Sequence, residues 1–390
     1  MTRTRWLHSS NHRTPLDPPL LGLPRTGNRT VKLKQTGPWI EHSGPDADVV
    51  VSSRARLARN LSGLPFVNQA TDSEKREVLQ LVQTLPLAGD RSEALLWIDL
   101  QQSTPEDRRL LFERHLVSRQ FLESASPRAV AIADDEQLSV MVNEEDHLRM
   151  QVLLPGLELE EAWRRVVEFD RRLEKNADIA VHPRWGYLTA CPTNVGTAIR
   201  FSVMLHLPGL RLTNELERLR RASNDLDLAV RGFYGEGSDS SGDFYQVSNQ
   251  LTLGVSETDL LATFVGEIVP RIVAYERMAR DILVERNATL LEDRVHRALG
   301  TLRSARLLAI EESMKHLSRV RLGIALGLLT DIPLGTVQRL FLQVQPAHLR
   351  RVQPDSTDDT ALEPVTEDRL LDDERTRRRR ADLVRSALSG

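Results

Sequence analysis

The chain has 390 residues, 40% of them hydrophobic and 27% charged, which is enough to bury one large core or two smaller ones. Its apolar runs are far shorter than a membrane-spanning helix needs, and residues 1–8 hold no signal-peptide core, so we expect a cytoplasmic protein without membrane contact. The net charge of −3 argues against a nucleic-acid partner, and the single cysteine excludes intrachain disulfides and multi-cysteine metal sites.

The N-terminal third changes from a polar tail to regular structure. Residues 1–36 lack apolar periodicity and predict a flexible tail. The β-branched run at 49–52 predicts a buried strand that enters an arginine-rich turn. A capping box at 71–74 opens one helix, and the pair Thr104-Pro105 begins another that runs toward His115.

The middle of the chain has the period of strands. Apolar segments at 129–133, 138–142 and 148–154 predict an antiparallel meander, and a long amphipathic helix follows at 158–176. Further strands are expected at 186–193, 227–234 and 244–248, with helices at 197–206 and 214–222 between them.

The C-terminal third is helical. After residue 256 the apolar period is that of helices almost throughout. A segment rich in Asp, Thr and Pro at 354–368 predicts a linker, and residues 375–388 predict a basic amphipathic helix whose charges could equally form a solvated face. Strands followed by helices indicate an α+β fold with a separate helical C-terminal domain.

Arginine carries most of the positive charge, with 47 arginines against five lysines. No lysine follows a glycine, which excludes a Walker A loop, and none ends the Val-Ala-Ile-Lys-like strand of protein kinases. Any phosphate binding must therefore use arginine, although a GC-rich genome is the simpler explanation of the imbalance as a whole.

Two polar clusters adjoin predicted strands in the first half of the chain. Arg54 and Arg56 alternate, so an extended segment presents both guanidinium groups on one face, where they suit a polyphosphate; a surface charge pair is the alternative. Three adjacent acids at 144–146 repel one another, which indicates either a solvated turn or a site beside cations. Arg149 lies on the next strand, where it could face phosphate while Glu145 faces an acceptor.

Two further clusters lie in the second half. Cys191 precedes a predicted helix whose dipole would favour its thiolate, and a buried structural cysteine is the alternative. The glycine-rich segment Arg231–Ser238 holds one arginine and one glutamate, and an ordinary surface turn explains it as well. Together the four clusters offer five arginines, enough to hold a nucleoside triphosphate without a Walker lysine.

In this order the clusters resemble the motifs of the ATP:guanido phosphotransferase (phosphagen kinase) family, and more closely those of the bacterial protein-arginine kinases of the McsB type. The motifs are Ser52-Ser53-Arg54-Ala55-Arg56, Asn143–Arg149, Cys191-Pro192-Thr193-Asn194-Val195-Gly196-Thr197 and Arg231–Glu236. The resemblance implies ATP-dependent phosphorylation of a guanidino group, with Mg²⁺ held mainly by phosphates and water. It implies a catalytic domain over 37–275, built on an antiparallel sheet flanked by helices, and a helical domain for dimerisation and substrate recognition over 276–390.

The resemblance also implies a role for each matching residue. Glu145 is the implied catalytic base, Glu236 the second carboxylate on the acceptor guanidinium, and Cys191 the thiol beside the reacting nitrogen. Nucleotide binding is implied for Ser52, Ser53, Arg54, Ala55, Arg56, His115, Arg149, Arg200, Phe201, Ser202, Val203, Met204, Arg231, Gly232, Phe233, Tyr234, Gly235 and Glu236, and no metal ligand is implied.

The acceptor is either protein arginine or a free guanidino compound. Small-molecule guanidino kinases carry a helical N-terminal domain that closes over the substrate, whereas only 48 residues precede Val49 here. We therefore expect an open acceptor side and protein substrates with exposed arginine. A kinase for a free guanidino compound, and a non-catalytic adaptor that binds nucleotide or phosphoarginine, are the alternatives.

The implied partners are a second copy of the chain in a homodimer, an activator protein and Clp-type protease machinery, in protein quality control or the stress response. The C-terminal segment departs from the McsB pattern, however. The allosteric Arg-Asp-x-x-Arg-Ala of that branch aligns with Thr376–Ala381, where only Arg380 and Ala381 match. Regulation by phosphoarginine therefore stays open.

Overall fold

The computed structural model describes residues 37–41, 43–87, 95–233, 241–352 and 373–389. The tail expected over 1–36 and the linker expected over 354–368 lie outside these residues. Within the described ranges no helix is long and apolar enough to cross a membrane.

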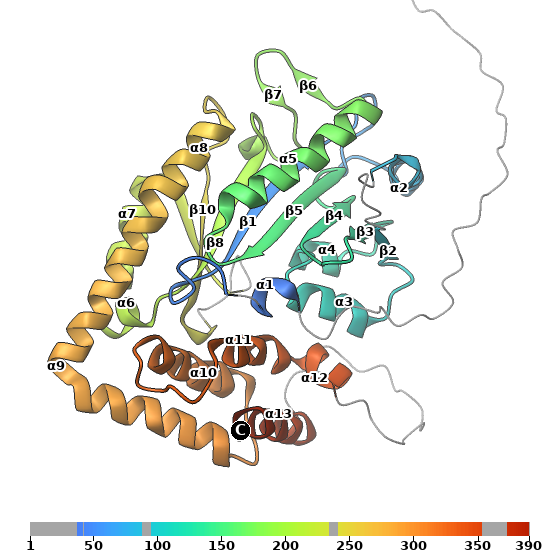
Figure 1. Ribbon diagram of the computed structural model, residues 1–390. Coiled ribbons are helices and arrows are strands. Elements are labelled where there is room, and N and C mark those ends of the chain that lie inside the picture. Colours follow the sequence, from blue (N-terminus) through green and yellow to red (C-terminus); the bar gives the residue numbers. More distant parts are fainter. Residues whose placement is uncertain (1–36, 42, 88–94, 234–240, 353–372, 390) are drawn as a thin grey trace, which may run out of the picture. The chain divides into compact units, whose positions relative to one another are not determined.

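Eight strands form one antiparallel sheet in the order β2-β3-β4-β5-β1-β8-β10-β9, with β1 near its middle (Figure 1). Its strands are β1 (Val50–Arg59), β2 (Leu96–Asp99), β3 (Ala129–Ile132), β4 (Leu138–Val142), β5 (Leu148–Pro155), β8 (Ile199–His206), β9 (Leu228–Gly232) and β10 (Phe244–Asn249). A separate two-stranded hairpin consists of β6 (Val181–His182) and β7 (Gly186–Tyr187).

The helices divide between those beside the sheet and those that follow it. The first group is α1 (Pro38–Glu41), α2 (Asp72–Thr84), α3 (Pro105–Glu113), α4 (Arg119–Glu123), α5 (Leu159–Asn176), α6 (Pro208–Leu212) and α7 (Leu216–Asp225). The second is α8 (Glu257–Thr263), a π-helical turn (Phe264–Ile268), α9 (Val269–Ser304), α10 (Ile310–Ala325), α11 (Leu334–Gln343), α12 (Pro346–Val352) and α13 (Glu374–Leu388).

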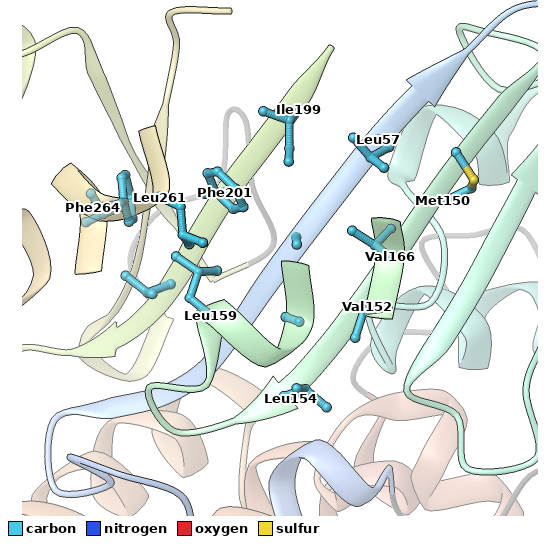
Figure 2. Close-up of a cluster of buried hydrophobic side chains, with 14 of the residues drawn as sticks. Leu57, Met150, Val152, Leu154, Leu159, Val166, Ile199, Phe201, Leu261 and Phe264 are labelled. Carbon is cyan, nitrogen blue, oxygen red and sulfur yellow. The ribbon is translucent and has the colours of Figure 1, made fainter. Parts of the chain in front are cut away.

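One face of the sheet is apolar and packs against helix α5. Figure 2 shows side chains of β1, β5 and β8 meeting Leu159 and Val166 of α5. Each such side chain, when fully buried, stabilises the fold by roughly 1.5–3 kcal/mol. The labelled sheet residues are Leu57, Met150, Val152, Leu154, Ile199 and Phe201. Because side chains alternate along a strand, the residues between them point to the opposite face.

That opposite face is covered at one end by the C-terminal helices. Leu153, Met204 and Phe244 of the sheet join a second hydrophobic cluster with side chains of α9, α10, α11 and α13. The basic helix α13 is amphipathic as expected, since Ala381, Val384 and Leu388 are buried. The uncovered part of this face is where polar side chains gather.

Most predicted elements are confirmed, and so is the α+β class with an antiparallel sheet and a helical C-terminal region. The capping box of α2 forms with Thr71, and Thr104 caps α3. Three expectations are wrong. The arginine-rich turn is a continuation of β1 as far as Arg59, the strand at 186–193 is reduced to Gly186–Tyr187, and the helix at 197–206 is strand β8.

The error at 197–206 has a plain physical reason. Apolar side chains stand at 199, 201, 203 and 205, and Arg200 and Ser202 alternate with them. This is the period of a strand with one buried face, so the alternation outweighs the helix propensity of the individual residues.

Candidate nucleotide and guanidinium site

Four arginines from three neighbouring strands share the polar face of the sheet. The register of β1 and β8 places Arg56 opposite Arg200, and that of β1 and β5 places Arg149 opposite Ala58. Residues directly opposite each other in an antiparallel pair point to the same side. Arg54 and Arg56 therefore lie on the same face as Arg149 and Arg200, as their alternation predicts.

The guanidinium groups repel one another. Burial, and then the charge of Arg200, lower the pKa of Arg54 to about 10. Burial, and then Arg54, Arg200 and Arg149, hold the pKa of Arg56 well below its usual value. A hollow beside them is lined by Arg56, Arg149 and Arg200 together with Asn194. Such a cluster stores electrostatic repulsion that a polyanion would relieve.

A second hollow lies on the same face of the sheet. Arg54 reaches it by donating from Nη2 to Gln246 Oε1 at 2.7 Å. Its lining comprises Trp39, Ser52, Arg54, His115, Leu153, Ser202, Met204 and Gln246. This hollow, with an aromatic wall and hydroxyl and amide groups, has the chemistry needed to hold a base and a ribose.

His115 is fixed in this second hollow by its neighbours. Its ring lies edge-on to Trp39, with centroids 5.4 Å apart, and to Phe233, at 5.0 Å. Its backbone is in the left-handed region, with φ of 59°, and its carbonyl accepts from Gln151 Nε2 at 2.7 Å. His115 is therefore held by contacts from three other segments of the chain.

The acidic loop between β4 and β5 surrounds one of the arginines. Arg149 pairs with Glu145, and also with Glu144 at 2.8 Å and Asp146 at 3.4 Å. Burial alone would lower the pKa of Arg149, but the three carboxylates together raise it above its usual value. Of the two interpretations of this cluster, a solvated turn or acids beside a cation, the structure supports the second.

Buried hydrogen bonds fix the shape of this loop. Asp146 accepts from Asn60 Nδ2 and from the Ala190 backbone N–H, both at 2.8 Å. His147 Nδ1 accepts from the Leu61 N–H at 3.0 Å. Asp146 therefore ties the segment before Cys191 to the acidic loop, while Glu145 keeps a half-buried side chain, 31% accessible.

Cys191 is half-buried and precedes a single 3-10 turn, Pro192–Asn194. The expected helix after it is absent from the described structure, so no helix dipole acts on the thiol. Its Sγ lies 3.0 Å from Thr193 Oγ1. The loop is held from the other side by Thr252, whose Oγ1 donates to the Val195 carbonyl at 2.9 Å.

The structure divides the other expected site residues by the face they occupy. Arg231 lies opposite Gln246 and so on the polar face, and Phe233 contacts His115. Gly232 is buried at the end of β9. Four residues instead belong to the opposite, buried face: Ser53, Ala55, Phe201 and Val203. Tyr234, Gly235 and Glu236 lie outside the described residues.

Sequence reasoning missed three residues that line the second hollow, Trp39, Leu153 and Gln246. Gln246 alternates with Ser248 along β10, so a strand prediction gives its spacing but not the identity of the face. Trp39 stands within a segment of four helical residues next to the expected tail, where no periodic pattern exists to detect. Only tertiary packing brings it to His115.

The burial of His115 makes the free energy of unfolding depend on pH. Burial, and then the charge of Arg54, lower the pKa of His115 from 6.5 to about 3, so it stays neutral in the folded protein while its unfolded counterpart binds a proton below about pH 6.5. Stability is therefore expected to fall as the pH drops from 6.5 toward 3. In His115→Asn the difference in urea midpoint between about pH 7 and about pH 5.5 should be smaller than in the parent. An equal difference in both proteins would contradict a neutral, buried His115.

Comparison with known proteins gives two matches to family models. The ATP:guanido phosphotransferase C-terminal catalytic domain matches residues 78–279, and the protein-arginine kinase McsB C-terminal domain matches residues 288–390. Among solved structures, the duplicated taurocyamine kinase from Schistosoma mansoni with bound transition state analog components is similar, with a TM-score of 0.55, 25% identity, and coverage of 63% of this chain and 36% of that chain. A lombricine kinase has a TM-score of 0.52 at 26% identity, over 64% of this chain and 70% of that one.

Curated relatives resemble the chain over most of its length. Protein-arginine kinase of Halothermothrix orenii is 42% identical over 321 residues, which is 82% of this chain and 91% of the relative. That of Symbiobacterium thermophilum is 45% identical over 317 residues, covering 80% and 89%, and that of Brevibacillus brevis 42% identical over 336 residues, covering 84% and 94%.

The antiparallel sheet with arginines on its open face is therefore the guanido kinase fold. The chain belongs to the ATP:guanido phosphotransferase family, and within it to the protein-arginine kinases.

Proposed function

We propose that the protein transfers the γ-phosphoryl group of ATP to the guanidinium group of arginine residues in proteins. The observation that supports this proposal is that groups of opposite charge meet on one face of the sheet. They are the arginine cluster of β1, β5 and β8 and the carboxylates of the loop that precedes β5. The cations suit a triphosphate, and the carboxylates suit the positive acceptor.

Binding of the triphosphate rests on the arginines. At an effective dielectric near 20, each guanidinium about 4 Å from a phosphate charge contributes roughly 4 kcal/mol of attraction before desolvation. Among the described residues no group of three or more His, Cys, Asp or Glu could hold a metal ion. Mg²⁺ would be held mainly by phosphate oxygens and water, where it would neutralise charge on the phosphates.

The chemical step needs orientation more than it needs a strong base. A terminal nitrogen of the acceptor guanidinium forms a bond to the γ-phosphorus, the bond to the β,γ-bridging oxygen breaks, and ADP leaves. The nitrogen proton passes to the Glu145 carboxylate. Because a carboxylate is a weak base and a guanidinium a very weak acid, proton transfer follows development of the nitrogen–phosphorus bond. Alignment by the carboxylates and charge stabilisation by the arginines supply most of the catalysis.

Protein arginine is favoured as the acceptor by the relatives, which are named protein-arginine kinases, and by the McsB-type C-terminal domain. With ATP present, the protein is expected to place acid-labile phosphate on an arginine-containing protein such as casein, and little on free arginine. Transfer confined to free arginine would identify a small-molecule guanidino kinase instead. Retained ATP binding with no transfer to either acceptor would favour an adaptor.

We propose the same setting for the protein as for its branch: a homodimer that acts on exposed arginines of client proteins, responds to an activator protein and delivers phosphorylated clients to Clp-type protease machinery under stress. These partners rest on family membership alone. The basic helix α13 does not add to the argument for phosphoarginine recognition, because Arg380 is buried and donates from Nε to the Val344 carbonyl at 2.8 Å.

A further inference from the structure

We propose that His348, in helix α12, is a positioning residue for the nucleotide pocket, which it completes by holding His115 through Glu113 and Arg114. The proposal rests on the proposed function in one respect, the assignment of the hollow around His115 to the nucleotide. It goes beyond that function because it gives the C-terminal domain a part in the nucleotide pocket. Glu113 and His115 lie in the catalytic-domain match, whereas His348 lies in the C-terminal-domain match.

A compact set of hydrogen bonds joins the two parts. Glu113 accepts from the backbone N–H of Ala347 at 3.1 Å and of His348 at 3.2 Å, and from His348 Nδ1 at 3.0 Å. Arg114 Nε lies 3.2 Å from His348 Nε2, and its Nη1 donates to Glu136 at 2.6 Å. The side chains of Glu113, Arg114 and His348 are at most 1% exposed.

The donors and acceptors of this set admit one arrangement. An arginine can only donate, so His348 Nε2 must accept from Arg114, and the ring proton is then on Nδ1, from which it donates to Glu113. His348 is thus a neutral bridge between a buried carboxylate and a buried guanidinium. Removal of its ring would leave both charged groups short of a partner in a dry environment, where an unsatisfied group is costly.

The hydrogen bonds that Glu113 and Arg114 make with His348 act on His115, the next residue after Arg114. His115 comes directly after Glu113 and Arg114, and its φ of 59° belongs to a Schellman motif that ends α3, in which the His115 N–H donates to the Phe112 carbonyl at 2.9 Å and the Leu116 N–H to the Leu111 carbonyl at 3.0 Å. Because Glu113 and Arg114 form the end of this helix, loss of their buried hydrogen bonds would let the helix end shift, and His115 with it. Its ring would then leave the position between Trp39 and Phe233 that makes it a wall of the hollow.

Glu136, at the other end of this set of hydrogen bonds, lies near the segment that carries Trp39. Glu136, the partner of Arg114, lies 3.9 Å from the point where a Cβ on Gly37 would stand. Helix α1, which carries Trp39, also packs against β5 and α11. Glu136 therefore lies beside the residue that precedes α1, and α1, which carries Trp39, packs against helix α11 of the C-terminal region.

The test is equilibrium binding of Mg²⁺-ADP by titration calorimetry to the full chain, together with the melting temperature and the kinetic constants. His348→Ala is expected to raise the Kd for ADP and the KM for ATP about tenfold, with a smaller change in kcat and in the KM for the protein substrate. His348→Asn, whose amide can still donate to Glu113 from the Nδ1 position, should recover part of the affinity.

Two controls separate positioning from loss of stability. Val384→Ala removes buried volume from α13 and should lower the melting temperature without changing the Kd for ADP. His296→Ala, at an exposed position of α9, should change neither. If His348→Ala does not fold, the comparison of His348→Asn with Val384→Ala at similar melting temperature still decides.

An unchanged Kd for ADP in the folded His348 variants would overturn the proposal. So would a rise in Kd for Val384→Ala as large as that for the His348 variants, since it would show that general loosening suffices. Failure of the unaltered protein to bind ADP at all would instead count against the proposed function.

Discussion

Glu145→Gln is expected to lower the rate of phosphoryl transfer on the order of a thousandfold and to leave nucleotide binding intact. The amide has the size of the carboxylate, but it neither accepts the nitrogen proton nor balances the charge of the acceptor guanidinium. Since Glu145 pairs with Arg149 in the protein without nucleotide, its neutralisation also frees that arginine for phosphate. The Kd for ADP should therefore be unchanged or lower.

The measurement is single-turnover transfer of labelled phosphate to casein at saturating ATP, beside calorimetric binding of ADP. Glu168→Gln, an exposed carboxylate on α5, is the matched control and should keep the parental rate. A rate for Glu145→Gln within tenfold of the parent would rule out Glu145 as the proton acceptor. A large loss of ADP affinity would instead indicate that the acidic loop mainly holds Arg149 in place.

Arg56→Gln is expected to make the free protein more stable and the enzyme almost inactive. The Arg56 guanidinium has three arginines around it and no ion pair among the described residues, and its pKa is lowered by burial first and then by repulsion from those arginines. Loss of that charge should raise the melting temperature of the nucleotide-free protein by about 2 °C, if it relieves on the order of 1 kcal/mol. Catalysis should fall on the order of a thousandfold, because the phosphates lose their central cation.

Thermal unfolding with and without Mg²⁺-ATP tests both halves of this expectation. The parent should gain stability from the nucleotide by mass action, and Arg56→Gln should gain much less. Arg218→Gln, an exposed arginine on α7, serves as the control and should behave as the parent does. A lower melting temperature for nucleotide-free Arg56→Gln would show that Arg56 is a structural cation and that the repulsion is compensated elsewhere.

The sequence predicts the site to the extent that the site follows from local periodicity. The alternation of Arg54 and Arg56 is sufficient to place both on one face, because β1 is extended and a strand has a period of two. The same rule, applied to Ile199–His206, would have identified β8 and placed Arg200 and Ser202 together on one of its faces. The error there lay in a helix assigned to an alternating segment.

The rest of the site depends on register and packing, which no local pattern contains. Gln246 reaches Arg54 only because β10 pairs with β8 in one particular register. Trp39 reaches His115 because α1 packs between β5 and α11. The absence of the expected helix after Cys191 removes the argument from a helix dipole, although Asn194, in the turn that follows Cys191, lines the hollow with the arginines.

The position of β1 in the sheet determines how readily its backbone amides exchange with solvent, compared with those of the edge strands. Strands β5 and β8 flank β1 and protect its backbone amides on both sides, whereas β9 is an edge strand, paired on one side only. Hydrogen exchange at β1 thus requires nearly global unfolding, while β9 can detach at much lower cost. Arg54 and Arg56, which we propose bind the phosphates, therefore belong to the most persistent part of the molecule. Arg231, on β9, belongs to a part that can exchange and rearrange while the triphosphate site stays assembled.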